Sequence, residues 1–246
     1  MAQVRVRFIG SGDAFGSGGR LQTCILVEAE GYRCLLDCGA SSLIGLKRAG
    51  VDPSGVDAVL VSHLHGDHFG GVPFLVLDGQ FSRRSRPLVV AGPPGLRERV
   101  TQAMEVFFPG SSTAPRRFET ELTELRDGLP TALGPLRVTP YEVVHACGAP
   151  PFALRVELGG RVIAYSGDTE WTDRLSLAAA GADLFICEAY HFDKRVPFHL
   201  DYATLMAHRE KLDCRRLVIT HMSAEMLARL PGLSVEAADD GLEILL

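Results

Sequence analysis

The chain has 246 residues, which is enough to bury a full hydrophobic core in one domain, and we expect a single domain over residues 1–246. Its 22% charged and 46% hydrophobic residues are those of an ordinary globular protein, which excludes intrinsic disorder as the default interpretation. The formal net charge of −5 excludes a global positive field that would gather phosphate backbones, so long nucleic acid is a disfavoured partner.

The N-terminus and the cysteines indicate the compartment. Residues 1–8 alternate polar and apolar side chains and lack the continuous apolar stretch of a signal peptide, and no segment reaches membrane-spanning length. The six cysteines are scattered, without the C-x-x-C spacing of a structural zinc or redox site, and we expect reduced thiols. These features predict a cytoplasmic protein without a membrane partner.

The first half of the chain predicts strands joined by turns, and one short helix. The strands are indicated by alternating or continuous apolar residues, and the helix by an apolar stretch that Gly50 closes. The last of these strands leads directly into a group of histidines. The expected strands are 4–9, 23–29, 32–36 and 57–62, and the expected helix is 41–50.

The second half repeats this plan, after a connecting region that contains a predicted helix at 96–108. A hairpin, a helix and an apolar strand again follow one another, and the last strand ends at His221 as the earlier one ends at His63. Two such halves predict an α/β fold of two packed sheets with helices outside and polar residues at one edge. The expected strands are 138–144, 152–157, 162–165, 183–187 and 216–220, with helices at 172–180 and 202–212.

The HLHGDH segment after the fourth strand is the strongest candidate for a metal site. On an extended strand end, His63, His65 and Asp67 would project to one side, and Gly66 would let the backbone turn so that His68 joins them. Four ligands within six residues do not fit one tetrahedral zinc, so we expect two metal ions. The plainer interpretation, a polar surface loop, poorly explains such a cluster directly after a buried strand.

Three further candidates stand where a predicted strand meets a loop. His145 follows the strand at 138–144, Asp168 ends the second hairpin, and His221 ends the last strand. Each alone would more simply be structural, but together they lie at the edge that carries the first cluster. Because histidine and carboxylate ligands accept zinc, manganese and iron, the metal stays open, with zinc as the first expectation.

These motifs, in this order, resemble the metallo-β-lactamase family. The resemblance extends from about residue 4 to about residue 223 and is carried by the H-x-H-x-D-H cluster, Gly70-Gly71-Val72-Pro73, His145, Ser166-Gly167-Asp168-Thr169 and Ile219-Thr220-His221-Met222-Ser223. It implies a four-layer αββα sandwich of two mixed sheets with a dinuclear site at one edge. It further implies one ion held by His63, His65 and His145, a second held by Asp67, His68 and His221, Asp168 as a bridge, and Asp37 as a hydrogen-bond acceptor that braces the histidine loop.

Within the family, the chain looks most like the branch of tRNase Z enzymes and phosphonate-pathway phosphodiesterases. The phrases around Asp168 and His221 resemble that branch, as does Gly92-Pro93-Pro94-Gly95-Leu96. Glu188 and His199 match its pair that protonates the leaving group, and Asp67 matches its carboxylate that orients or deprotonates the nucleophile. The resemblance thus implies a metal-dependent hydrolase, a phosphodiesterase whose catalytic residues are Asp67, Glu188 and His199.

Departures from the branch bear on the substrate. Only residues 146–167 separate His145 from Asp168, which leaves no room for the long Gly/Pro-rich arm by which tRNase Z enzymes hold tRNA. The Pro and basic loop expected near the N-terminus is replaced by residues 13–17, and the extra cysteine-rich zinc site of some phosphonate-pathway enzymes is missing. With the negative charge, these departures favour a small phosphodiester, such as a cyclic nucleotide or cyclic ribose phosphate, over precursor tRNA.

Three alternatives stay open. A thioester or lactone hydrolase would use the same metal centre, but a thiolate leaves without a proton and needs no acid such as His199. A non-catalytic binding or carrier protein of a cofactor pathway should have a damaged ligand set, and an RNA-processing nuclease is the third alternative. The sequence does not decide whether the chain forms a homodimer, nor whether His191 or the basic run Arg83, Arg84 and Arg86 contacts substrate.

Overall fold

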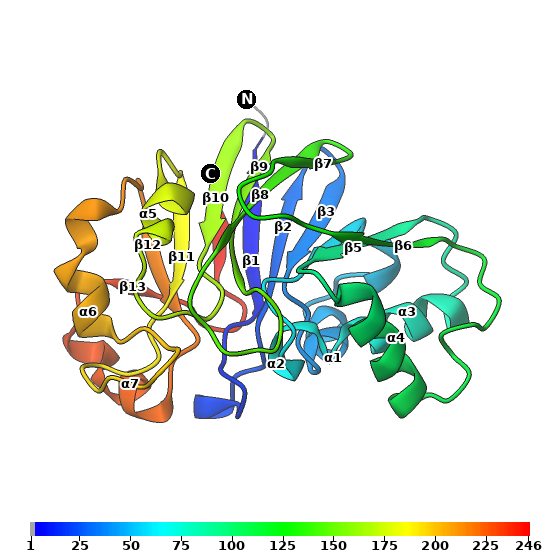
Figure 1. Ribbon diagram of the computed structural model, residues 1–246, viewed down its shortest axis with the longest axis horizontal. Helices are drawn as coiled ribbons and strands as arrows, with labels where there is room; N and C mark the ends of the chain where they lie inside the picture. Colours follow the sequence, from blue (N-terminus) through cyan, green and yellow to red (C-terminus); the bar gives the residue numbers. More distant parts are fainter. Residues whose placement is uncertain (1–2) are drawn as a thin grey trace.

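Two seven-stranded β-sheets pack against each other in the computed structural model, which describes residues 3–246 (Figure 1). The first sheet has the order β14-β1-β2-β3-β4-β5-β6 and is antiparallel from β14 to β3 and parallel from β3 to β6. Its strands are β1 (Arg5–Gly10), β2 (Cys24–Ala29), β3 (Tyr32–Leu36), β4 (Ala58–Leu60), β5 (Leu88–Gly92), β6 (Thr120–Glu124) and β14 (Glu243–Leu245).

The second sheet repeats the pattern of the first. Its order is β13-β12-β11-β10-β9-β8-β7, antiparallel from β7 to β10 and parallel from β10 to β13. In both sheets a hairpin therefore pairs in parallel with the strand that follows a helix. The strands are β7 (Thr131–Leu133), β8 (Leu136–Glu142), β9 (Phe152–Leu158), β10 (Arg161–Tyr165), β11 (Leu184–Glu188), β12 (Leu217–Thr220) and β13 (Glu236–Ala237).

Helices cover the outer face of each sheet. Helices α1, α3 and α4 pack on the first sheet and α5, α6 and α7 on the second, while α2 is a single turn at the sheet edge. None of the helices in residues 3–246 is long and apolar enough to cross a membrane. The helices are α1 (Ser42–Arg48), α2 (Gly66–Phe69), α3 (Val72–Phe81), α4 (Leu96–Phe107), α5 (Arg174–Ala179), α6 (Tyr202–Ala207) and α7 (Ala224–Arg229), with 3-10 turns η1 (Ser17–Gly19), η2 (Pro53–Gly55), η3 (Arg209–Lys211) and η4 (Leu230–Gly232).

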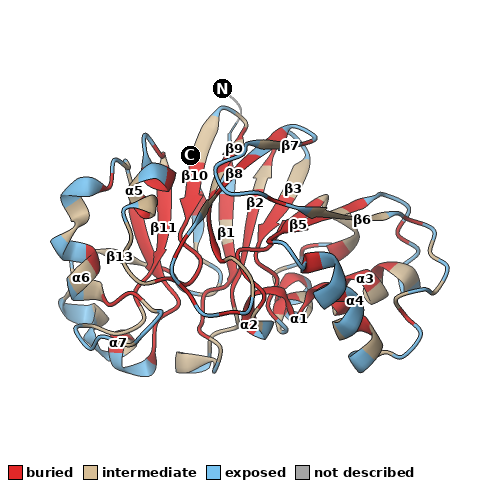
Figure 2. Cartoon of the chain, viewed as in Figure 1, coloured by how far each residue is buried: buried red, intermediate tan, exposed pale blue. Residues whose placement is uncertain are grey.

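The four layers follow from the alternation of apolar side chains along the strands. Ile25 of β2 and Ile163 of β10 belong to the core between the sheets, whereas their neighbours Leu26 and Ala164 face the outer helices. Because both faces of the central strands are covered, these strands are buried along most of their length (Figure 2). The αββα sandwich of two mixed sheets predicted from the sequence is confirmed.

Several predicted elements are shorter in the structure, among them one strand and one helix next to the candidate site residues. The strand expected at 57–62 is paired as β4 only over Ala58–Leu60, although Val61 still donates a hydrogen bond to the Ala91 carbonyl at 2.7 Å. The helix expected at 202–212 ends as α6 at Ala207, because the N–H of His208 bonds back to Leu205 in a tighter 3-10 pattern that continues into η3.

Candidate metal centre

The HLHGDH segment leaves β4 and forms one helical turn. His65 precedes α2 with extended backbone (φ −85°, ψ 151°), and the carbonyl of His65 accepts from the N–H groups of His68 and Phe69 at 3.0 Å. The expectation of an extended backbone through Asp67 is therefore wrong: Asp67 and His68 lie inside α2. Gly66 has no left-handed φ, so the turn itself does not require a glycine at this position.

The turn can approach the first hairpin because glycines line their contact. A Cβ on Gly39 would lie 2.2 Å from the carbonyl oxygen of Asp67, and one on Gly71 would lie 2.2 Å from the carbonyl of Gly39. The N–H of Cys38 also bonds to the His68 carbonyl at 2.6 Å. The segment is thereby held against the end of β3.

The structure brings the seven candidate metal ligands into two adjoining groups. Nitrogen and oxygen atoms within each group lie within 4.8 Å of one another. Asp168 lies between the groups, with Oδ1 3.3 Å from His68 Nε2 and Oδ2 3.9 Å from His63 Nε2. The groups are His63, His65 and His145, and Asp67, His68, Asp168 and His221.

The unpaired atoms of these groups fit a divalent cation. His63 Nε2, His68 Nε2 and Asp168 Oδ1 are buried and make no well-aligned hydrogen bond within residues 3–246, although the last two atoms lie 3.3 Å apart. Buried polar atoms without partners cost free energy, and imidazole nitrogen together with carboxylate oxygen is a donor set that divalent metals accept. The assignment of each residue to an ion stays a prediction.

The charge balance of the cluster also favours a cation. Burial lowers the pKa of His63 well below its ordinary value and keeps the ring neutral, as metal binding requires. Burial opposes protonation of His68 and His221 too, but the carboxylate of Asp168 raises the pKa of His68 well above its ordinary value and that of His221 to about 9. The buried carboxylates of Asp67 and Asp168 thus stabilise positive charge within the cluster.

Asp37 occupies the position of the brace that the resemblance implies. It is fully buried at the end of β3 with left-handed backbone, φ 58°. Its carboxylate accepts from the N–H of Ser62 at 2.7 Å and from Tyr165 Oη at 2.9 Å, and lies 2.7 Å from His68 Nδ1. Because Nδ1 is engaged there, Nε2 of His68 turns toward the cluster. Ser62 and Tyr165 had no individual signal in the sequence.

Backbone contacts hold two of the other candidate ligands. His145 Nδ1 lies 2.7 Å from the carbonyl of Phe198, and His65 Nδ1 lies 3.1 Å from His145 Nε2. His221 has left-handed backbone (φ 56°), and its N–H bonds to the Ser11 carbonyl at 3.2 Å. The loop after β1 therefore supports a candidate ligand that lies after β12.

Glu188 and His199 form a hydrogen-bonded pair beside the cluster. Glu188 ends β11 and is fully buried, with Oε2 3.0 Å from His199 Nδ1, while Oε1 accepts from the N–H of Thr169. Burial acts to lower the pKa of His199, but the hydrogen bond and charge of the Glu188 carboxylate, together with the charge of Asp168, outweigh burial and raise that pKa. The pair therefore favours a protonated His199 imidazole. Glu188 contacts its Nδ1, which leaves Nε2 available to another partner.

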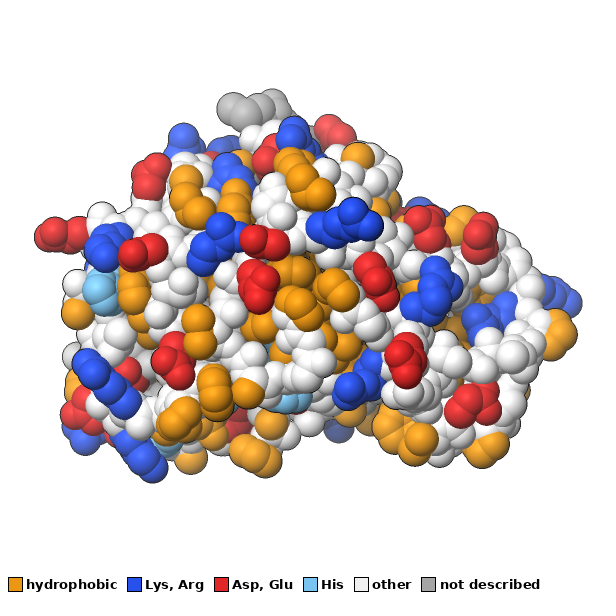
Figure 3. Space-filling model, in the orientation of Figure 1, with side chains coloured by type: hydrophobic (Ala, Val, Ile, Leu, Met, Phe, Trp, Pro, Cys, Tyr) orange, Lys and Arg blue, Asp and Glu red, His pale blue; other side chains and the backbone are white. Residues whose placement is uncertain are grey.

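A cavity of about 220 Å³ opens onto these groups. Histidine side chains, pale blue, reach the surface beside apolar side chains at the lower edge of Figure 3. Phe15 and Tyr190 had not been identified from the sequence, because neither belongs to a metal-binding motif. The cavity is lined by Ala14, Phe15, His65, Asp67, Asp168, Tyr190, His199 and His221.

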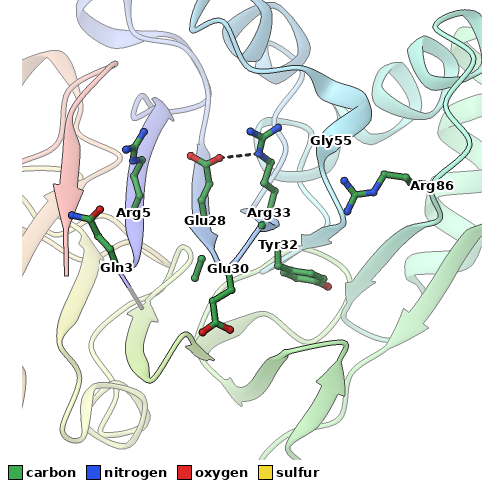
Figure 4. A pocket seen from close by; sticks show the side chains of 10 residues that line it. Gln3, Arg5, Glu28, Glu30, Tyr32, Arg33, Gly55 and Arg86 are labelled. Carbon is green, nitrogen blue, oxygen red and sulfur yellow. Dashed lines mark hydrogen bonds and ion pairs between the residues drawn. The ribbon is translucent and has the colours of Figure 1, made fainter. Parts of the chain in front are cut away.

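A larger open hollow of about 440 Å³ lies at the β2–β3 turn (Figure 4). This is the end of β3 opposite to the one that leads into Asp37. Most of its charged side chains pair with one another or with neighbours: Arg33 Nε lies 2.8 Å from Glu28, and Arg86 bonds to Asp57. These pairs explain the charges at this end of the sheet without a ligand.

The remaining basic and histidine candidates lie outside the cavity. Arg84 is buried and donates to backbone carbonyls, among them Pro53 at 3.2 Å, so it holds a loop together. His191 Nδ1 lies 3.2 Å from both Ser223 Oγ and Glu225 Oε2. His208 stacks on Trp171 with ring centroids 4.1 Å apart, so it has a packing role.

Comparisons with known proteins agree with this geometry. The family model described as Beta-lactamase superfamily domain matches residues 32–222. Ribonuclease Z of Methanosarcina acetivorans is 26% identical over 268 residues, which cover 90% of this chain and 88% of that protein. The short form of human tRNase Z superposes with a TM-score of 0.79 at 25% identity over 98% of both chains. The metallo-beta-lactamase fold protein YhfI from Bacillus subtilis superposes over all of both chains with a TM-score of 0.82 at 21% identity.

The family match spans most of the chain and includes the whole cluster. It begins at the start of β3, before Asp37, and ends directly after His221. Both groups of candidate ligands and the Glu188–His199 pair therefore lie inside the matched segment. The chain belongs to the Beta-lactamase superfamily domain family and is a metal-dependent hydrolase.

Proposed function

We propose that the chain is a phosphodiesterase that hydrolyses a small phosphodiester at a dinuclear metal centre. The observation that carries the proposal is the Glu188–His199 pair at 3.0 Å, at the rim of a cavity that both groups of candidate ligands line. An alkoxide leaving group needs a proton at neutral pH, whereas a thiolate does not, so an acid in this place favours phosphodiesters over thioesters.

The proposed ligand sets follow the two groups, with Asp168 shared between them. Divalent ions bound there, zinc by first expectation and manganese or iron as alternatives, would supply Lewis acidity toward a phosphoryl oxygen and toward the nucleophilic water. One ion would be held by His63, His65 and His145, and the other by Asp67, His68 and His221.

The side chains of the cavity would move the protons. Asp67 would orient the attacking water and accept its proton as the new P–O bond forms. His199 would donate its Nε2 proton to the leaving oxygen as the ester P–O bond breaks, and Glu188 would hold the Nδ1–H of the ring throughout. Asp67, Glu188 and His199 are the proposed catalytic residues.

The shape of the chain near the cavity supports a small substrate. The strands β9 and β10, which lie between His145 and Asp168, are joined only by Gly159 and Gly160, so this region has no long arm. The cavity holds about 220 Å³, and the net charge is −5. A small-molecule phosphodiester fits these features better than a long polyanion.

An RNA-processing nuclease is the second candidate, supported by the ribonuclease Z relative and the human tRNase Z structure. A hydrolysis panel separates the candidates. It contains bis-p-nitrophenyl phosphate, cyclic nucleotides, a precursor tRNA, a thioester and a lactone, each with zinc, manganese and iron. Turnover of the small phosphodiesters supports the proposal, preferred cleavage of precursor tRNA supports the nuclease, and turnover of the thioester or lactone alone rejects both.

A further inference from the structure

An exposed aromatic side chain borders the cavity of the metal centre. Phe15 is 86% exposed, the largest exposed fraction among the large hydrophobic side chains of residues 3–246. It lines the cavity together with Asp67, Asp168 and His221. Single exposed apolar residues are common on protein surfaces, so exposure alone would mean little. The position of this ring, beside the proposed reacting groups, is what sets it apart.

The loop that carries Phe15 is held by a buried carboxylate. Asp13 is 1% exposed, and its Oδ1 accepts from the N–H of Phe15 at 3.2 Å and from the N–H of Ser17 at 2.9 Å. Its Oδ2 accepts from the Ser17 hydroxyl at 2.7 Å. The backbone on both sides of Phe15 is therefore tied down, so the side chain leaves the loop from a fixed point.

A second carboxylate closes the ends of the same loop. Asp240 accepts from the N–H of Ser11 at 2.9 Å and from the N–H of Leu21 at 2.8 Å. At the tip, a Cβ on Gly18 would lie 2.8 Å from a methyl of Leu227. The turn η1 therefore packs directly on α7, a helix that covers the second sheet. The loop occupies the blue turn between α2 and α7 at the lower edge of Figure 1.

We infer that Phe15 binds substrate by stacking on a flat aromatic ring, a nucleobase, carried by the phosphodiester. The inference rests on the proposed function and names its substrate class as nucleoside phosphodiesters. A ring held at the mouth of a cavity offers its face at little cost in conformational entropy, and base stacking on aromatic side chains tolerates any base. Tyr190 lines the same cavity with its ring 4.8 Å from that of His199, so the catalytic side also carries an aromatic surface.

Two substrates with the same leaving group test the inference. Thymidine 5′-p-nitrophenyl phosphate carries a base, and methyl p-nitrophenyl phosphate does not. In the wild type, kcat/KM favours the thymidine substrate, and Phe15→Ala lowers the ratio of the two kcat/KM values on the order of 10-fold, the scale of one stacking contact. Phe15→Trp keeps the ratio, whereas Phe15→Leu loses it. Phe81→Ala removes a phenylalanine of similar exposure, 80%, from the end of α3 and serves as the matched control.

A binding measurement makes the test independent of turnover. Calorimetric titration with adenosine 5′-monophosphate and with inorganic phosphate should show a preference for the nucleotide that Phe15→Ala removes. Equal ratios and equal affinities in wild type and Phe15→Ala, or full activity of Phe15→Leu, overturn the inference even when phosphodiesters are hydrolysed. If no phosphodiester is hydrolysed but the nucleotide preference depends on Phe15, the proposed function fails and base stacking stands. A change of the sedimentation coefficient in Phe15→Ala would instead assign the ring to contact between copies of the chain and overturn the inference.

Discussion

Asp37 shows how strongly the candidate centre depends on a residue outside the two groups. Its carboxylate gathers Ser62, His68 and Tyr165, and these contacts join the end of β3, the histidine segment and the end of β10. The left-handed φ of 58° at a non-glycine residue costs free energy, which the hydrogen bonds of the buried carboxylate offset. Asp37 thus fixes the orientation of the His68 ring from the side opposite to the candidate metal ligands.

We predict that Asp37→Asn weakens metal binding about 10- to 100-fold, because the amide cannot accept from every donor around it and His68 loses its fixed tautomer. Competition with a chromogenic chelator measures the affinity. Asp173→Asn changes a surface carboxylate with a 79% exposed side chain and is the control. An Asp37→Asn affinity equal to that of the control would contradict the proposed brace.

We predict that His199→Ala lowers kcat about 10²- to 10⁴-fold for a phosphodiester with an alkoxide leaving group, and far less for one that releases the stable p-nitrophenolate. Glu188→Gln should show the same selectivity with a smaller loss, because it leaves the ring in place without the carboxylate that raises its pKa. Steady-state kinetics on matched substrates gives both values. Equal losses on both substrates would show a merely structural role.

At the scale of elements, the contact between α2 and the first hairpin decides where the histidine segment lies. Gly39 and Gly71 leave no space for a side chain, whereas a Cβ on Gly66 would meet no atom within 4 Å. The two sorts of glycine stand within a short stretch of sequence and look alike there. Only the packing around them tells which glycine the element requires.

We predict that Gly39→Ala displaces α2 and lowers the metal affinity. Overpacking should also lower the free energy of unfolding by about 1–3 kcal/mol, and with it the melting temperature. Gly66→Ala is the matched control in the same turn, since it adds the same methyl group in open space without a left-handed φ. Thermal unfolding followed by circular dichroism compares them. A larger loss for Gly66→Ala would reverse this interpretation of the turn.

The sequence predicted the β2–β3 and β9–β10 hairpins and the helices α1, α4, α5 and α6, because alternation and turn residues are local signals. It did not predict α2, because the histidines suggested an extended strand end and the glycine contacts that favour a helical turn come from distant segments. The strand β6 was missed because its sequence, TELTE, is polar and has no buried face pattern. The predicted site residues do meet at one edge, but Phe15 and Tyr190 could not be placed there without the fold.

At the scale of the whole molecule, the buried cluster links metal binding to stability. The unpaired atoms of His63, His68 and Asp168 lie where the two sheets meet, so a cation that binds only the folded state stabilises it. We predict that chelation lowers the melting temperature and that zinc, manganese or iron restores it, with two ions per chain by elemental analysis. Fewer than one ion per chain after saturation would contradict a dinuclear centre.

We also predict that metal binding weakens as the pH falls. Proposed histidine ligands bind ions as neutral imidazoles, so protons compete with the metal, and the stability added by the metal is present at about pH 7.5 and reduced at about pH 5.5. Calorimetry with and without chelator at the two pH values measures this difference. A metal contribution that grows on acidification would be inconsistent with histidine ligation.

The division of the two groups between the halves of the chain has a consequence for folding. Each group combines residues that follow β4 with residues from the second half, and Asp240 meets Ser11 across 229 residues of sequence. Contacts this distant form late and slowly in β-rich proteins. Neither half offers a complete set of ligands, so metal loading should follow the docking of the sheets and cannot direct it. In this respect the chain differs from small zinc domains, in which the ion itself drives the chain to fold.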